Sequence, residues 1–215
     1  MAESIPKKKE RVLNIIRIFD RVYGDADCTL EYKDPLQLLI ATQLAAQCTD
    51  ARVNLVTPAL FKKYKTAQDF ANADAEELSS IIRSTGFYRN KTKNIIACGK
   101  KLVADFGGKV PETMDELLAL PGVGRKTANL VLGDIFGKPG IVVDTHAGRL
   151  ARRMGLTKNT DPYKVELDLL KLVPEEKQSM FCHQLVFHGR EFCNARKPFC
   201  NACPVRDFCP RAGVD

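Results

Sequence analysis

The chain has 215 residues, with 33 lysines and arginines against 26 aspartates and glutamates, and a formal net charge of +7 at pH 7. This length allows one large domain or two small ones, and no apolar run approaches the length of a membrane span, which excludes a membrane-spanning protein. The positive charge favours a polyanionic partner such as DNA, although many basic proteins bind no nucleic acid. The first residues lack the apolar core of a signal peptide, so we expect a cytoplasmic protein, associated with the nucleoid if it is bacterial.

Helical spacing of apolar residues recurs almost throughout the chain, and no convincing alternating strand pattern interrupts it. The first amphipathic face consists of Val12, Leu13, Ile15, Ile16, Phe19, Val22 and Tyr23. Asp34 then predicts the N-cap of a helix whose first residue is Pro35. Pro58 interrupts the next helical stretch, where we expect a break or a kink.

Later helix starts carry the same kind of capping residue, at Asp74, Thr113 and Asp161. Asp74 is followed by Glu77 at the spacing of a capping box. A long helix is predicted from about residue 88 to residue 106, before two glycines. These patterns predict an all-α fold of about ten short helices, with a domain boundary in the short connection Lys138-Pro139-Gly140.

The most informative segment of the chain lies between residues 120 and 146. Here Pro121-Gly122-Val123-Gly124 separates two helical patterns and predicts a glycine-rich hairpin. Backbone N–H groups at a helix N-terminus bind phosphate oxygens, and glycine at positions 122 and 124 permits unusual backbone angles and close approach of a phosphate. The alternative is an ordinary connection between two helices, because Pro-Gly turns are common.

Two residues of this segment have side chains suited to chemistry. Lys126 lies in the first turn after the hairpin, where the positive end of the helix disfavours an ammonium ion and favours loss of its proton. A neutral lysine amine is a nucleophile that forms Schiff bases, although a phosphate-binding or merely exposed lysine is the alternative. Asp144 precedes another helix, so its carboxylate can act in catalysis, cap that helix, or do both. Together with the hairpin, these two residues point to chemistry on DNA.

Four of the eight cysteines lie near the C-terminus with the spacing C-x6-C-x2-C-x5-C: Cys193, Cys200, Cys203 and Cys209. In an intracellular protein they are expected to be metal ligands rather than disulfides. Structural zinc prefers two close pairs of ligands, and this pattern has one such pair, so the spacing slightly favours an iron–sulfur cluster and leaves zinc open. The other cysteines are predicted to be small core residues: Cys28, Cys48, Cys98 and Cys182.

Three longer segments accompany these features: LLIATQLAAQCTD at 38–50, GFYRNKTKNI at 86–95 and HGREFCNARKPFC at 188–200. In this order, and together with the hairpin, Lys126, Asp144 and the cysteine spacing, they closely resemble the endonuclease III family. Members of that family are helix-hairpin-helix DNA glycosylases that remove damaged pyrimidines. The resemblance covers nearly the whole chain.

The resemblance implies two helical lobes flanking a DNA cleft. One lobe, residues 28–138, would be a six-helix barrel whose helix-hairpin-helix motif occupies about residues 113–137. The other lobe would join residues 1–27 to residues 139–215 and hold a [4Fe–4S] cluster on the four cysteines of the 193–209 loop. The resemblance also implies a monomer that acts on double-stranded DNA containing damaged pyrimidines or abasic sites.

The same resemblance implies a bifunctional DNA glycosylase and AP lyase of base excision repair. Lys126 would attack C1′ of the sugar as the damaged base departs. The resulting Schiff base would lower the barrier to β-elimination, which breaks the strand on the 3′ side. Asp144 would stabilise positive charge on the sugar and assist proton transfer.

The residues expected to contact DNA come from the hairpin and from three other positions: Leu120, Gly122, Val123, Gly124, Arg125, Gln47, Phe87 and His146. Enzymes that act on a base flip it out of the stack. Gln47 would fill the gap that the flipped nucleotide leaves, Phe87 would wedge into the opposite strand, and His146 would have a minor binding role. The family usually has an aliphatic residue at Phe87, and larger or more polar residues at Ala45 and Gly148, so opposite-base preference and base recognition are expected to differ.

Three alternatives stay open from the sequence. Relatives that remove adenine opposite oxidised guanine generally lack the lysine and carry an extra C-terminal domain, whereas this sequence has Lys126 and ends six residues after Cys209. Mismatch-specific thymine glycosylases share the scaffold and often carry tyrosine in place of the lysine. A non-catalytic DNA-binding protein with a zinc-stabilised tail would need neither Lys126 nor Asp144.

Overall fold

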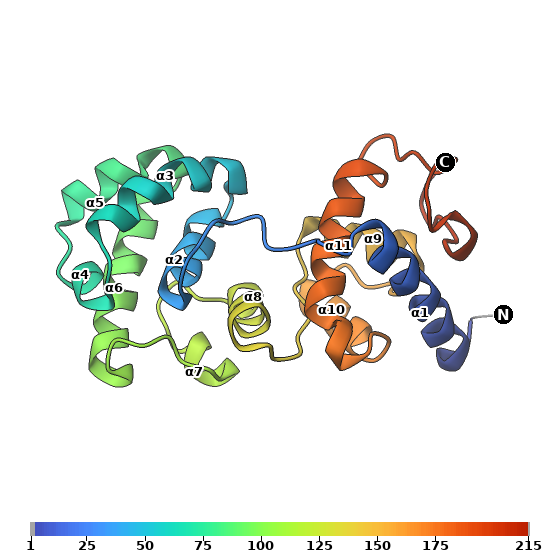
Figure 1. Cartoon of the computed structure of the whole chain (residues 1–215), viewed down its shortest axis with the longest axis horizontal. Helices are drawn as coiled ribbons and strands as arrows, with labels where there is room; N and C mark the ends of the chain where they lie inside the picture. The colour runs from blue at the N-terminus through green and yellow to red at the C-terminus, as the bar shows by residue number, and fades with distance from the viewer. Residues whose placement is uncertain (1–2, 215) are drawn as a thin grey trace. The chain divides into compact units, whose positions relative to one another are not determined.

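The computed structural model describes residues 3–214, and the regular elements in that range are all helical (Figure 1). The α-helices are α1 (Ile5–Val22), α2 (Pro35–Ala45), α3 (Asp50–Lys63), α4 (Ala67–Ala71), α5 (Ala75–Ile82), α6 (Tyr88–Phe106), α7 (Met114–Leu118), α8 (Arg125–Phe136), α9 (Thr145–Arg153), α10 (Pro162–Leu170) and α11 (Gln178–Glu191). Three 3-10 helices accompany them: η1 (Arg83–Thr85), η2 (Glu175–Lys177) and η3 (Arg206–Phe208). This content confirms the all-α prediction, and no described helix is long and apolar enough to cross a membrane.

The chain divides into two compact units, each with its own hydrophobic core. One unit is continuous and comprises Cys28–Gly137. The other joins the segment that ends at Asp27 to the segment that begins at Lys138. In the discontinuous unit the N-terminal segment therefore completes a core whose other buried residues lie between Ile141 and Val205.

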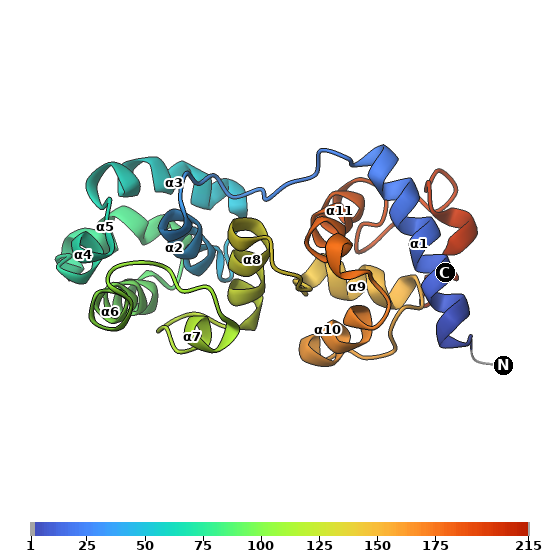
Figure 2. The ribbon, with the colours of Figure 1, turned by 60° about the horizontal axis from the view of Figure 1, so that its bottom comes forward.

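Helix α2 is the central element of the continuous unit. All seven residues from Leu38 to Leu44 are buried, so this helix is enclosed on every side rather than on one stripe. Helices α3, α6 and α8 surround it (Figure 2). Because α2 is enclosed in this way, the segment that follows its last residue, Ala45, starts from a fixed position.

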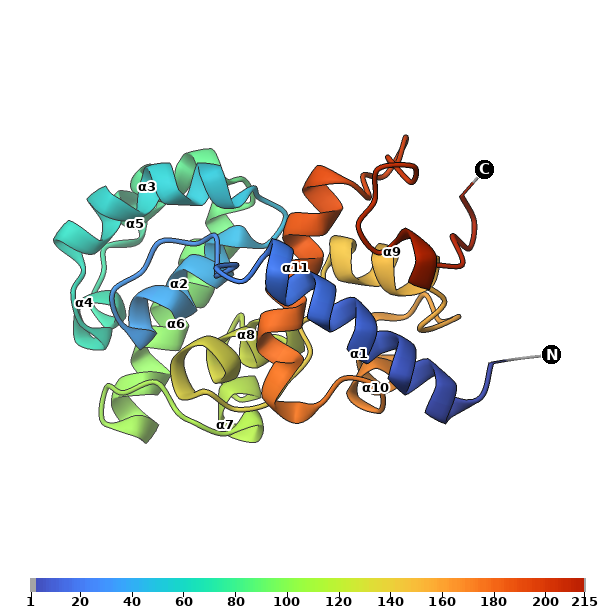
Figure 3. The same cartoon turned by 45° about the vertical axis from the view of Figure 1, so that its right-hand side comes forward.

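Helix α1 packs in the discontinuous unit through one buried face, formed by Val12, Ile15, Ile16 and Phe19. It lies beside α11 and η3, and α11 in turn packs against α9 (Figure 3). The predicted amphipathic face is therefore the face that packs, although Leu13 and Val22 from that prediction are exposed.

Most helix starts are set by a side-chain cap, as the sequence predicts. Asp34 accepts a hydrogen bond from the Gln37 amide at 2.8 Å, and Asp74 accepts one from the Glu77 amide at 2.8 Å. The predicted capping box at Asp74 is wrong in its second half, because the Glu77 carboxylate pairs with Lys63 instead of returning to the cap.

Of the break or kink expected at Pro58, the break is absent. Helix α3 runs through Pro58 without interruption, although proline removes one backbone hydrogen bond from a helix interior. Val53, Val56 and Leu60 on either side of Pro58 are buried in the core. Their burial stabilises the continuous helix by more than the lost bond costs.

Candidate functional site

The hairpin joins α7 to α8 and is held by buried apolar side chains. Leu120 is 2% exposed and Val123 is 8% exposed, and the Val123 amide donates to the Leu120 carbonyl at 3.2 Å. Gly124 is the N-cap of α8 and provides no side-chain cap, and Arg125 is the first residue of the helix. The amides of this first turn therefore have no capping side chain, which suits them to bind an anion.

Glycine is required at only one of the two hairpin positions considered above. Gly122 has a φ of 77°, and a Cβ there would lie 2.8 Å from Gln43 Oε1 and 2.9 Å from Asn94 Cβ. Gly124 has a φ of −104°, and a Cβ there would meet no atom within 4 Å. The expectation of an unusual backbone angle thus holds for Gly122 and is wrong for Gly124, where close approach of a ligand is the remaining reason for glycine.

Replacing Gly122 with alanine should lower the free energy of unfolding by roughly 2 kcal/mol, because the new Cβ adds left-handed strain and overlaps two side chains. Gly124→Ala is the matched control and should change that free energy by less than about 0.5 kcal/mol. Thermal or denaturant unfolding of the two variants measures the difference. Equal stability of both variants would contradict this description of the hairpin.

Lys126 is the second residue of α8, and its side chain is exposed. Among residues 3–214, no side chain forms an ion pair or a hydrogen bond with it. The amine is therefore held by its helix but is not engaged by the protein, an arrangement that leaves it available to an external electrophile.

Asp144 is the N-cap of α9, as its position before Thr145 predicts. Its Oδ1 accepts a hydrogen bond from the Ala147 amide at 2.7 Å, and the side chain is partly exposed. No described residue donates a hydrogen bond to Oδ2. One carboxylate oxygen thus orients the side chain while the other is available for a ligand, so capping and chemistry are compatible.

His146 is the second residue of the same helix and contacts other residues of its own unit. Its Nδ1 is 3.1 Å from Arg149 Nη2, and a Cβ on Gly189 of α11 would lie only 2.5 Å from that nitrogen. The ring is therefore packed against α11. This contact gives His146 a structural role beside the minor binding role expected from the sequence.

Gln47 and Phe87 lie on one hollow of the continuous unit, although forty residues separate them in sequence. The residues that line this hollow include Gln47, Phe87, Gly122, Asn90, Lys91 and Asn94. The Phe87 side chain is 62% exposed. Both Gln47 (φ 55°) and Phe87 (φ 47°) adopt the left-handed conformation that residues other than glycine rarely adopt. Strain of this kind at exposed residues is often associated with function.

Sequence reasoning missed four polar residues of this hollow. Gln43 lies on α2, four residues before Gln47, and Asn90 and Asn94 are one turn apart on α6. Their helical spacing relative to Gln47 and Phe87 is a signal that could have found them. Lys91, also on the hollow, is four residues after Phe87 and has the same spacing, but its burial depends on contacts that are distant in sequence.

The four C-terminal cysteines line a single pocket in the discontinuous unit. His188 Nε2 lies 3.5 Å from Cys203 Sγ, and Arg153 Nη1 donates to Cys193 Sγ at 3.4 Å. Within residues 3–214, however, no three Cys, His, Asp or Glu side chains converge closely enough to hold one metal ion. Four thiols that line one pocket are a donor set that fits a soft metal centre, either a single zinc ion or an iron–sulfur cluster.

The environment of the thiols also fits a cationic cluster core. Burial raises the pKa of Cys203 to about 11, and the charges of the neighbouring cysteines raise it further. Burial likewise raises the pKa of Cys209, where the Arg11 guanidinium acts in the opposite direction. A bound cation would favour the thiolate forms of these two cysteines.

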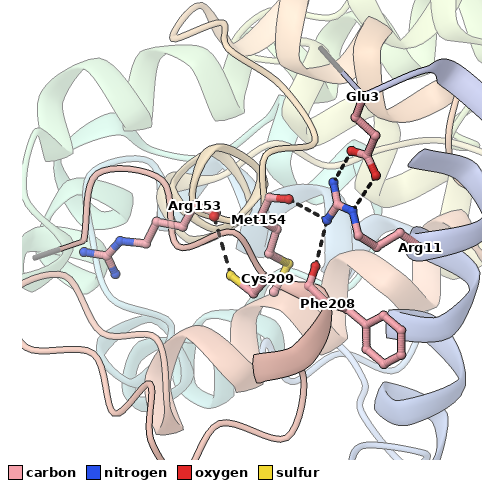
Figure 4. Close-up of polar contacts among 6 residues, drawn as sticks. All are labelled: Glu3, Arg11, Arg153, Met154, Phe208 and Cys209. Carbon is pink, nitrogen blue, oxygen red and sulfur yellow. Dashed lines mark hydrogen bonds and ion pairs between the residues drawn. The ribbon is translucent and has the colours of Figure 1, made fainter. Parts of the chain in front are cut away.

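The cysteine segment is held by the N-terminal helix through one arginine (Figure 4). Arg11 Nη1 donates to the Met154 carbonyl at 2.7 Å and to the Phe208 carbonyl at 2.8 Å. Its Nε and Nη2 donate to the two carboxylate oxygens of Glu3 at 2.9 and 2.7 Å. Because Phe208 directly precedes Cys209, Arg11 fixes the main chain beside a cysteine of the pocket.

Comparisons with known proteins agree with this geometry. Residues 40–175 match the family described as HhH-GPD superfamily base excision DNA repair protein. Endonuclease III of Synechocystis sp. is 49% identical over 213 residues, which cover 99% of this chain and 97% of that protein. Endonuclease III of Bacillus subtilis is 46% identical over 87% of this chain and 86% of that protein.

Solved structures of DNA complexes are similar along almost the whole chain. A non-covalent endonuclease III–DNA complex superimposes with a TM-score of 0.89 and 43% identity, over 94% of this chain and 95% of that chain. A trapped covalent endonuclease III–DNA intermediate gives the same TM-score and identity, over 94% and 96%. A thermostable thymine-DNA glycosylase is more distant, with a TM-score of 0.82 and 25% identity over 97% and 98%. The chain therefore belongs to the endonuclease III family of base excision DNA repair enzymes.

Proposed function

We propose that the chain excises damaged pyrimidines from duplex DNA and then cleaves the strand, with Lys126 as the nucleophile and Asp144 as the second catalytic residue. The observation that carries this proposal is the state of Lys126, an exposed amine without an ion pair at the start of a helix that follows a rigid hairpin. A trapped covalent complex of a relative at 43% identity supports an enzyme that bonds to its substrate.

Lys126 forms the covalent bond in this mechanism. Its neutral amine attacks C1′ of the sugar, the glycosidic bond breaks, and the base leaves with the bonding electrons and gains a proton. Opening of the sugar ring gives a Schiff base between the lysine nitrogen and C1′. Loss of a C2′ proton then allows β-elimination, which expels the 3′ phosphate.

Asp144 assists through the carboxylate oxygen that does not cap α9. A negative charge beside the sugar stabilises the positive charge that develops on it as the base departs. The same oxygen can accept or return a proton during ring opening. The cap bond to the Ala147 amide keeps the carboxylate in one orientation while this occurs.

The DNA contacts follow from the hairpin and the hollow. The uncapped amides from Gly124 onward would bind phosphate oxygens without regard to sequence. Gln47 would fill the gap left by the flipped nucleotide, and the exposed Phe87 ring would wedge into the opposite strand. An aromatic wedge stacks on bases with a larger surface than an aliphatic one, so we expect a distinct opposite-base preference.

A [4Fe–4S] cluster on Cys193, Cys200, Cys203 and Cys209 completes the proposal. The pocket that the four cysteines share and the membership in the endonuclease III family support it. When bound, the cluster would hold the C-terminal segment in place and take no part in base removal. We also propose a cytoplasmic location for the protein, which its similarity to bacterial DNA repair enzymes supports.

Arg11→Gln should release the cluster roughly 10-fold faster than the parent protein, because residues that orient metal ligands typically change metal retention by that factor. The measurement is the loss of visible iron–sulfur absorption in the presence of an iron chelator. Arg17→Gln is the matched control: Arg17 is on the same helix, is exposed and binds only Asn14. Equal rates for both variants would contradict a role of Arg11 in holding Cys209.

The proposed function is tested on a duplex that contains one oxidised pyrimidine. The parent protein should release the free base and give a strand cleaved 3′ to the lesion. A parallel duplex with a thymine–guanine mismatch tests the thymine-specific alternative. Base release from the mismatch alone would overturn the proposal in favour of that alternative, and release from neither duplex would overturn a glycosylase function.

A further inference from the structure

Lys91 on α6 is a buried cation for which the mechanism above has no use. Its side chain is 6% exposed, and its ammonium forms no ion pair with any residue in the described range 3–214. Instead, Nζ donates to the main-chain carbonyls of Leu44 at 2.7 Å and Thr85 at 2.8 Å. A buried charge held only by two carbonyls is costly, which indicates that the position requires these two bonds.

Both carbonyls lie at the ends of helical elements. Leu44 is in the last turn of α2, and Thr85 is the last residue of η1. Carbonyls at a helix end have no partner within the helix, and a buried one needs a donor from elsewhere. A cation is also the favoured group at a helix C-terminus. Lys91 supplies both donors from a single side chain.

The two residues with left-handed backbone conformations, Gln47 and Phe87, lie a few residues after these carbonyls. Gln47, with a φ of 55°, is three residues beyond Leu44, and Phe87, with a φ of 47°, is two residues beyond Thr85. The Lys91 amide also donates to the Phe87 carbonyl at 3.1 Å. Strained conformations persist only where the surrounding structure holds them. Lys91 bonds to both segments just before they turn into the hollow.

We propose that Lys91 is a positioning residue that joins the end of α2 to the turn before α6 and thereby holds Gln47 and Phe87 in the conformations that insert into DNA. This inference rests on the proposed function, in which those two side chains replace and wedge apart bases. A phosphate contact by Lys91 is a weaker reading, because the ammonium is buried and bonded to two carbonyls.

The first test compares Lys91→Met with Lys100→Met, which removes an exposed lysine from the same helix. Each variant is assayed on a duplex with a paired lesion and on one whose opposite strand lacks the facing nucleotide. Lys91→Met should lower kcat/KM on the paired duplex about 100-fold, because small displacements of positioning groups cost that much. On the duplex that lacks the facing nucleotide, kcat/KM should fall less than about threefold. The lesion is already unpaired there, so the help of Gln47 and Phe87 in unpairing it is not needed.

A double-mutant cycle identifies the residues through which Lys91 acts. In a Gln47→Ala/Phe87→Ala background, the further change Lys91→Met should lower kcat/KM by less than about twofold on the paired duplex. Independent effects that multiply would show that Lys91 acts elsewhere and would overturn the inference. Equal losses on both duplexes, the sign of a general structural defect, would overturn it as well.

Two further outcomes are distinguishable from these. If the Gln47→Ala/Phe87→Ala protein is as active as the parent, the proposed insertion role of those residues fails, and the inference fails with it. If Lys91→Met does not fold, the double-mutant cycle is repeated with Lys91→Arg, whose guanidinium is a hydrogen-bond donor of different shape. We expect a loss of about fivefold that again disappears in the double-alanine background, and a loss that persists there would overturn the inference.

Discussion

Lys126→Gln should lower strand cleavage at an abasic site on the order of 10⁴-fold, the scale of loss seen when a covalent nucleophile is removed. Glutamine has a similar length but cannot form a Schiff base. The change should leave stability unaltered, because Lys126 is exposed and forms no ion pair among the described residues. Single-turnover cleavage of a duplex with one abasic site measures the effect.

The control for this variant is Lys109→Gln, which removes the same charge from an exposed position after α6. It should cleave within about twofold of the parent, as expected for a surface substitution. A comparable loss in both variants would mean that net charge, rather than the amine of Lys126, governs the reaction. Retention of cleavage by Lys126→Gln would remove Lys126 from the mechanism.

Asp144→Asn and Asp144→Ala should separate catalysis from capping. Asparagine caps helices about as well as aspartate, so Asp144→Asn should change the free energy of unfolding by only a few tenths of a kcal/mol. Alanine cannot cap, and Asp144→Ala should lower that free energy by about 1 kcal/mol. Both variants should lose base release by roughly 10²–10³-fold, because both remove the charge that stabilises the sugar.

Unfolding curves and single-turnover base release measure the two effects of Asp144 separately. A variant Asp144→Asn that retains full activity would reduce Asp144 to a cap. Activity that falls only in the variant that also loses stability would likewise mean that Asp144 acts only as a helix cap. The predicted pattern, with activity lost in both and stability lost in one, requires the two carboxylate oxygens to act differently.

Local signals in the sequence place the starts and ends of several helices. Asp34 and Pro35 place the start of α2, and the two glycines after Phe106 place the end of α6, because caps and helix stops depend on residues a few positions apart. The incorrect break at Pro58 shows the limit of this reasoning. Proline propensity is local, whereas the burial of Val53 and Leu60 that overrides it is a tertiary effect.

The candidate site likewise combines residues that local sequence signals identify with residues that only the tertiary structure brings together. The hairpin, Lys126 and the cap at Asp144 lie in one segment and follow from its spacing. The hollow does not, because it gathers residues from α2, α6 and the hairpin. The sequence does not set Lys91 apart, and its burial and its bonds to Leu44 and Thr85 are seen only in the structure. The collision that requires glycine at position 122 is equally a contact between distant segments.

The measurement that tests the central claim most directly is borohydride trapping on a duplex with one oxidised pyrimidine, followed by mass spectrometry of the attached peptide. Reduction converts a Schiff base into a stable bond, so the residue that carries the sugar identifies the nucleophile. We predict one covalent adduct, located at Lys126, and no adduct from Lys126→Gln. Base release without any adduct, or an adduct at another residue of the parent protein, would contradict the assignment of Lys126 as the nucleophile.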